Sequence, residues 1–114
     1  MKIKNLKESN PFTVTVKQKH IDNGVAYSGT FCPIALALRD IFDEKSCIIS
    51  VEGDEVLIEF DGMLYYLEWE QGHGEGCMED ARKFIDNFDK DNIDKVKPQE
   101  FYMFLDYSYD IRND

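Results

Sequence analysis

Three apolar segments joined by two tight turns constrain the fold of this chain more than any other feature. The segments are Cys47–Val51, Val56–Phe60 and Met63–Trp69. Turn residues separate them at Gly53-Asp54 and at Asp61-Gly62, and Asp-Gly is a strong signal for a two-residue hairpin loop. The sequence therefore predicts a three-stranded antiparallel meander.

The register of this meander follows from the loop lengths. Two residues in each loop predict four facing pairs, which are Val51 with Val56, Ile49 with Ile58, Phe60 with Met63, and Ile58 with Tyr65. Side chains alternate between the two faces of a strand, so all of these fall on one face, joined by Cys47, Leu67 and Trp69. A slip of one residue would turn a whole strand over, so the agreement between two independent turns favours this register.

The flanking segments predict two more strands and two helices. Phe12–Lys17 alternates apolar and polar residues, as a strand with one buried face does. His20–Gly24 is typical of a single helical turn. Apolar stripes at helical spacing predict helices over Pro33–Phe42 and Cys77–Phe88, and the aromatic segment Phe101–Tyr107 predicts a last strand.

The resulting order, β-α-β-β-β-α-β, predicts an α+β fold in which two helices pack on one face of an antiparallel-rich sheet. At 114 residues the chain is long enough for one core and too short for two, so we expect a single domain over residues 1–114. Residues 1–10 are expected to be a flexible lead-in.

The charge is strongly acidic and unevenly distributed. The net charge is −10, yet residues 1–19 hold five lysines and one glutamate, so the rest of the chain carries −14. An anionic surface opposes direct binding to nucleic-acid phosphate and to anionic membranes. It attracts a partner protein with a basic surface, or it simply keeps the protein soluble.

The three cysteines favour free thiols. Their number is odd, they lie far apart, and the first residues lack the apolar region of a secretory leader. We therefore expect a protein of the reducing cytoplasm.

Cys32 is the candidate nucleophile, because it stands directly before a helix that begins with Pro33. A helix N-terminus can lower the pKa of a thiol, and His20 or His73 would have to complete a Cys–His pair. Nothing in the sequence places either histidine beside it. The favoured interpretation is structural, because cysteine is a small residue that suits a tight, buried helix entry.

Metal and acid–base sites have weaker support. A zinc site would need Cys32, Cys47, His73 and Cys77, but these do not form the two close ligand pairs of structural zinc sites, so no metal or cofactor is expected. The many carboxylates are expected to form a solvated face, since general acid–base catalysis requires carboxylates in contrasting environments.

The second face of the meander is the candidate binding surface. Leu57, Leu64 and Tyr66 are predicted to lie there beside Glu59 and Glu68, and Tyr102 and Phe104 of the last strand are expected to join them. The adjoining turn adds three further acids, Glu52, Asp54 and Glu55. Apolar and tyrosine side chains rimmed by acid are typical of a protein interface. A different protein would cover this face, or else the terminal segments of the chain or a second copy in a homodimer would do so.

Two stretches of the chain carry a family resemblance. "VTVKQKHIDNGVAYSGTFCPIALAL", from Val14 to Leu38, and "ARKFIDNFDKDNIDKVKPQEFYMFL", from Ala81 to Leu105, resemble a group of small uncharacterised proteins of bacteriophages and mobile elements. The shared features are a His-Ile-x-x-Gly turn, a Cys-Pro-[IV]-Ala-x-Ala-Leu helix start and a late Phe-[IV]-x-x-Phe-Asp helix. The resemblance implies a phage protein in a host bacterial cytoplasm, and it implies no activity.

Three hypotheses about function follow. The leading one is a non-enzymatic inhibitor of a host defence or nucleic-acid-handling protein, of the anti-CRISPR type, acting through the acidic, aromatic surface. The second is a protein that sequesters a signalling nucleotide at an oligomer interface, with Tyr65, Tyr66 or Trp69 stacking on the base. The third is a thiol enzyme that uses Cys32.

Overall fold

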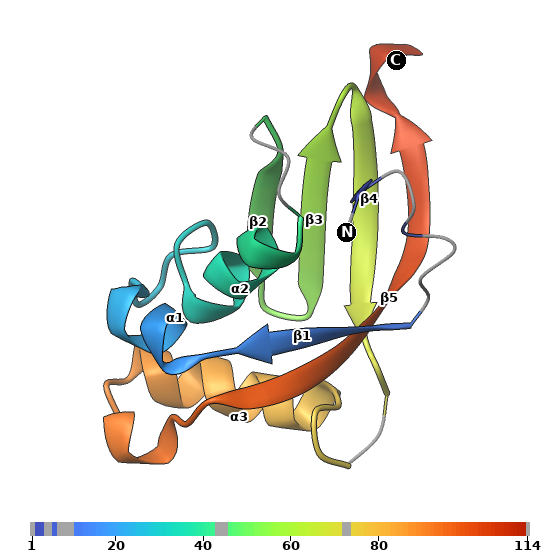
Figure 1. Ribbon diagram of the computed structural model, residues 1–114. Coiled ribbons are helices and arrows are strands. Elements are labelled where there is room, and N and C mark those ends of the chain that lie inside the picture. Colours follow the sequence, from blue (N-terminus) through green and yellow to red (C-terminus); the bar gives the residue numbers. More distant parts are fainter. Residues whose placement is uncertain (1, 4–5, 7–10, 43–45, 72–73, 114) are drawn as a thin grey trace.

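In the part of the chain that the structure describes, five strands and three α-helices surround one core (Figure 1). The computed structural model describes residues 2–3, 6, 11–42, 46–71 and 74–113. In chain order the elements are β1 (Phe12–Val16), α1 (Gln18–Asn23), α2 (Pro33–Ile41), β2 (Ile48–Glu52), β3 (Glu55–Phe60), β4 (Met63–Trp69), α3 (Met78–Asp89), the 3-10 turn η2 (Ile93–Lys95), β5 (Gln99–Asp110) and the 3-10 turn η3 (Ile111–Asn113).

The strands form one antiparallel sheet in the order β1-β5-β4-β3-β2. The α+β class with an antiparallel-rich sheet, predicted from the sequence, is therefore confirmed. The last strand lies between the first strand, which forms one edge of the sheet, and the meander, so β5 joins β1 to the rest of the sheet. In Figure 1, β1 lies beside the first half of β5.

The meander has the register that its turns predict. Val51 faces Val56 and Ile49 faces Ile58 across β2 and β3. Phe60 faces Met63 and Ile58 faces Tyr65 across β3 and β4. At the second turn, Asp61 and Gly62 have φ values of 49° and 75°. Two consecutive left-handed residues make the hairpin turn that Asp-Gly favours.

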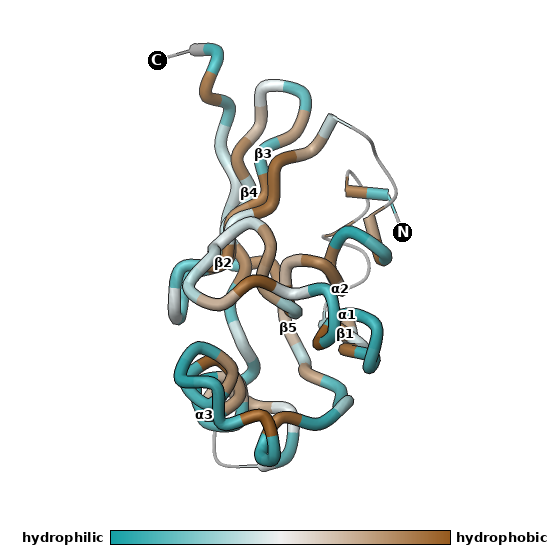
Figure 2. The backbone as a smooth tube through the Cα atoms, turned by 90° about the vertical axis from the view of Figure 1, so that its left-hand side faces the viewer, coloured by the Kyte–Doolittle hydropathy of each residue, from teal (hydrophilic) through white to brown (hydrophobic). Residues whose placement is uncertain are grey.

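Helices α2 and α3 cover the face of the sheet that carries the buried side chains. Ile34 and Leu38 of α2 are fully buried in the core. Phe84 of α3 contacts Phe101 edge to face at 5.4 Å, and Phe101 in turn contacts Trp69 at 5.6 Å. Figure 2 shows α1 and α2 on one side of β3 and β4. None of the helices in the described part of the chain is long and apolar enough to cross a membrane.

Helix α1 is longer than the single turn expected from the sequence. It spans Gln18–Asn23, and Gly24 follows it in an extended conformation rather than as a left-handed cap. Gly24 serves a close approach instead, because a Cβ there would stand 2.7 Å from the ring of Pro33. The close approach between the end of α1 and the start of α2 therefore requires glycine at position 24.

Strand β5 is also longer than predicted and is interrupted by a β-bulge. Leu67 pairs with Leu105, but the preceding residue of β4, Tyr66, pairs with Tyr107 and not with Asp106. Asp106 is therefore the extra residue, and the side chains that follow it change faces. Phe101, Met103 and Leu105 point into the core, whereas Tyr107 and Tyr109 are 50% and 39% exposed.

Part of the expected lead-in contributes to the core. Ile3 and Leu6 are both buried and belong to the main hydrophobic cluster. Residues 1, 4–5 and 7–10 lie outside the described residues.

Phe101 connects α3 to the sheet, so its removal should destabilise the whole fold. Phe101→Ala leaves a cavity between Trp69 and Phe84, and we expect a loss of about 3–5 kcal/mol in the free energy of unfolding, measured by urea denaturation. Phe31→Ala is the matched control, because Phe31 is 55% exposed. Equal losses in the two variants would contradict the assigned core.

Candidate functional site

The outer face of the sheet, opposite the helices, brings together most of the predicted binding residues. We define this outer face by the side chains of Ile48, Ser50, Glu52, Glu55, Leu57, Glu59, Leu64, Tyr66, Glu68, Phe104, Asp106, Tyr107 and Tyr109. Along β2, β3 and β4, these outward-facing residues alternate with core residues. The strand register determines which of them lie next to one another on adjacent strands.

One row of the outer face is apolar and aromatic. Leu57 pairs with Tyr66, and Tyr66 pairs with Tyr107. The rings of Tyr66 and Tyr107 stack with their centroids 4.4 Å apart and an angle of 15° between their planes. Tyr109 continues the stack at 6.0 Å from Tyr66, and it pairs with Leu64 on the neighbouring strand. The centre of the outer face is therefore a tyrosine stack with leucine beside it.

The next row is acidic. Glu52 pairs with Glu55 across β2 and β3. Val56 of β3 pairs with Leu67 of β4. The residue before Val56, Glu55, and the residue after Leu67, Glu68, therefore lie opposite one another on these two strands. Desolvation, followed by the charge and hydrogen bonding of Asp106, raises the pKa of Glu68. Carboxylates thus follow one another across β2, β3, β4 and the bulge of β5.

The same acids affect the tyrosine stack. Desolvation, followed by contact with Tyr66, raises the pKa of Tyr107, and the charges of Asp106 and Glu55 act in the same direction. The Tyr107 phenol is neutral at physiological pH even without this shift, and the raised pKa moves its ionisation further from that range. The stack therefore places aromatic rings beside carboxylates.

Strands β2 to β5 contain no lysine or arginine, so the acids of the outer face have no basic neighbour within these strands. Two nearby arginines are bound to other acids. Arg82 of α3 donates to Asp54 at 2.8 Å, and Arg112 donates to Asp110 at 3.0 Å. Uncompensated carboxylates repel one another, and a cationic partner would relieve that repulsion.

Asp54 does not join the other predicted binding residues. Its carboxylate is held by Arg82 of α3, and this hydrogen bond lowers the pKa of Asp54. Asp54 therefore links the β2–β3 turn to α3. This ion pair could not be predicted from the sequence, because Asp54 and Arg82 are far apart along the chain.

The sequence also failed to identify Tyr107, Tyr109 and Asp106 as part of the outer face. Uniform alternation after Phe101, Met103 and Leu105 would place Tyr107 in the core, and only the bulge reverses this. Phe104 lies on the outer face as expected, opposite Glu68. Tyr102 instead stands beside Gly76, where an added Cβ would meet its ring at 2.7 Å.

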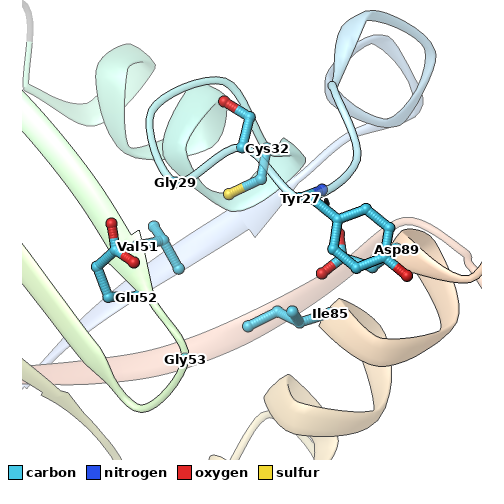
Figure 3. A pocket seen from close by; sticks show the side chains of 9 residues that line it. Tyr27, Gly29, Cys32, Val51, Glu52, Gly53, Ile85 and Asp89 are labelled. Carbon is cyan, nitrogen blue, oxygen red and sulfur yellow. Dashed lines mark hydrogen bonds between the residues drawn. The ribbon is translucent and has the colours of Figure 1, made fainter.

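Cys32 lies at a small cavity of about 190 Å³ between the loop before α2, the end of β2, and α3 (Figure 3). Its thiol points toward Val51, and Ile85 and Asp89 of α3 line the same space. The loop is held there because the Tyr27 N–H donates to Asp89 at 2.8 Å and the Val51 N–H donates to the Gly29 carbonyl at 2.8 Å.

The environment of Cys32 suits a structural thiol. Cys32 is 8% exposed, and burial raises its pKa despite smaller opposing effects from the N–H groups of Ala35 and Ile34. A raised pKa reduces the thiolate that a nucleophile requires. The helix N-terminus is present as predicted, but desolvation outweighs it.

His20 is engaged elsewhere in the structure. Its Nδ1 accepts a hydrogen bond from the Lys17 N–H at 2.8 Å, so the ring hydrogen is on Nε2, which donates to Asp40 at 2.7 Å. Both ring nitrogens therefore serve the start of α1 and its contact with α2. His73, the other histidine, lies outside the described residues.

The zinc and nucleotide alternatives have little geometric support. Across the described ranges no three His, Cys, Asp or Glu side chains gather as metal ligands. Trp69 is 1% exposed, so its ring is not open to a base. Carboxylates line both the Cys32 cavity and a second one of about 320 Å³ beside Glu75, Asp80 and Glu100, where they would repel phosphate.

A scan against protein-family models and searches among curated proteins and solved structures give no match for this chain. The resemblance to phage proteins therefore stays a prediction.

The burial of Cys32 predicts slow alkylation. With iodoacetamide at neutral pH, we expect the half-buried Cys77 to react first, whereas Cys32 and Cys47 react at the rate at which the protein opens. Mass spectrometry of digested samples would give the order, and urea should equalise the three rates. Rapid alkylation of Cys32 in the folded protein would revive the thiol-enzyme hypothesis.

Asp40 should make part of the stability pH-dependent. Hydrogen bonding to His20, and then to Lys19, lowers the pKa of Asp40, so its stabilising effect is complete above the unfolded pKa and is lost as the pH falls through the folded value. We expect Asp40→Asn to cost about 0.5–1 kcal/mol at pH 6. Urea denaturation should show this difference narrowing below about pH 4.

The control for this prediction is Asp94→Asn, because Asp94 stands on the exposed turn η2. Its stability curve should follow that of the wild type at every pH. A difference between wild type and Asp40→Asn that grows on acidification would contradict the assigned role of Asp40.

Proposed function

We propose that this protein is a non-enzymatic binding protein that docks its outer face onto a basic surface of another protein. The observation that carries the proposal is the arrangement of the outer face, in which a tyrosine stack adjoins a row of carboxylates and no lysine or arginine stands among them. Protein interfaces are enriched in tyrosine at their centre and polar at their rim. The outer face has this composition.

The charge of the face determines which partner fits. Four carboxylates, those of Glu52, Glu55, Glu68 and Asp106, follow one another across the sheet. Such a row attracts lysine and arginine side chains and repels phosphate. Proteins that handle nucleic acids carry basic channels for the phosphate backbone. The outer face is therefore suited to occupy such a channel in place of the nucleic acid.

The finer proposal is that the partner is a host defence or nucleic-acid-handling protein and that binding inhibits it, as an anti-CRISPR-type protein would in a bacterial cytoplasm. The resemblance to phage and mobile-element proteins supports this setting, and the charge of the outer face supports the mechanism. Neither argument involves catalysis.

A homodimer through the outer face has less support than a basic partner. In a two-fold symmetric interface the same patch faces itself, so the acidic rows of two copies would lie near one another. Like charges across an interface oppose association. The described strands offer no basic residues to offset this repulsion.

The test is capture from a bacterial lysate by the wild type and by the triple variant Glu52→Gln, Glu55→Gln, Glu68→Gln. We expect the wild type to retain a basic protein and the variant to lose it, with binding weakened on the order of tenfold between about 50 and 300 mM salt. The captured protein should then bind its nucleic acid less tightly when the wild type is added.

The matched control is the triple variant Asp22→Asn, Asp91→Asn, Asp94→Asn, which changes the net charge equally at exposed positions off the outer face. This control should capture the partner as the wild type does. Equal losses in both variants would show that only total charge matters, and unchanged nucleic-acid binding by the partner would contradict the inhibitory mechanism.

A further inference from the structure

We propose that the outer face recognises arginine specifically, with a guanidinium of the partner stacked on the ring of Tyr107 and paired with the carboxylates of Glu68 and Asp106. This inference rests on the proposed function, because it names the group on the basic partner that the outer face would bind. It assigns the tyrosine stack and the bulge a shared role in recognition.

The tyrosine stack has a shape that suits a planar cation. Tyr66 and Tyr107 lie nearly parallel, at 15°, with their centroids 4.4 Å apart. One side of the Tyr107 ring is therefore covered by Tyr66, yet the residue remains 50% exposed. A guanidinium is planar and weakly hydrated, so it stacks well on an open aromatic face.

Two carboxylates lie next to the tyrosine stack. Asp106 is the bulged residue directly before Tyr107, and Glu68 lies on the neighbouring strand two residues beyond Tyr66. The pKa of Glu68 is raised by desolvation and then by Asp106, which indicates that the two carboxyl groups crowd one another. A guanidinium has donors in a fixed fork and can bridge two oxygens while its plane rests on a ring.

Lysine is expected to bind this site less tightly than arginine. An ammonium group is a compact, strongly hydrated charge without a flat face, so it would gain from the carboxylates and less from the stack. The preference for arginine over lysine should therefore depend on the aromatic ring at position 107, whereas the affinity for any cation should depend on the acidic row.

A second copy of this chain is a poor source of the guanidinium. The chain has arginine at positions 39, 82 and 112. Arg82 and Arg112 are paired with Asp54 and Asp110. Arg39 lies over the ring of Phe31, with its charged carbon 5.9 Å from the ring centroid. The arginine is therefore assigned to a different protein.

The experiment compares two peptides of equal length and charge, one with arginine and one with lysine at every cationic position, spaced by glycine and serine. Fluorescence anisotropy at about 100 mM salt gives their affinities for the full chain. We expect the arginine peptide to bind roughly tenfold more tightly. Tyr107→Leu should abolish that preference, and Tyr107→Phe should keep it.

Charge variants separate the two parts of the site. Asp106→Asn should weaken the arginine peptide several-fold. The matched control Asp94→Asn should leave both affinities unchanged. Circular dichroism and urea denaturation of each variant establish that the fold is intact.

The outcomes distinguish this inference from the proposed function. Equal affinity for the two peptides, with both weakened by the triple variant of Glu52, Glu55 and Glu68, would overturn arginine recognition and leave the basic-partner proposal standing. No binding of either peptide would overturn both. A dimer of the free protein that dissociates on Tyr107→Leu would show that a second copy occupies the outer face, which also overturns the inference.

Discussion

The pairing of β4 with β5 is the interaction on which the rest of the structure depends. Strand β5 joins β1 to the meander, so without this pairing the sheet would separate into the β2-β3-β4 meander and the β1–β5 pair. The ladder also contains the bulge at Asp106. On one side of the bulge β5 supplies Phe101, Met103 and Leu105 to the core, and on the other it supplies Tyr107 and Tyr109 to the outer face.

Side chains alternate between the two faces of each strand, so the residues that must be buried on one face determine which residues stand on the other. Because Val56, Ile58 and Leu67 must be buried, Glu55, Leu57, Tyr66 and Glu68 have to face outward together. The core therefore determines which residues form the outer face, and the turns at Gly53 and Gly62 determine their neighbours across the strands. A binding surface built in this way is rigid, which lowers the entropic cost of association.

Local signals in the sequence were enough to predict the meander, its register, and the helices α2 and α3, because tight turns and apolar periodicity act over a few residues. The bulge could not be predicted, since Phe101, Met103, Leu105, Tyr107 and Tyr109 continue one alternation without a break. The ion pair of Asp54 with Arg82 and the hydrogen bonds of His20 were also missed, because both join residues brought together only by the fold. Of these contacts, the ion pair between Asp54 and Arg82 separates Asp54 from the acids of the outer face.

Ion pairs relieve the acidic charge of the described residues unevenly. A net charge of −10 opposes folding through self-repulsion, and ion pairs with Arg82, Arg112 and Lys19 relieve it at the turns and helices. No lysine or arginine of strands β2 to β5 offsets the charges of the row Glu52, Glu55, Glu68 and Asp106, although Glu52 accepts a hydrogen bond from the Ser50 hydroxyl. Under the proposed function, a cationic partner would remove the same repulsion on binding, so the electrostatic repulsion in the free protein would contribute to the affinity of the complex.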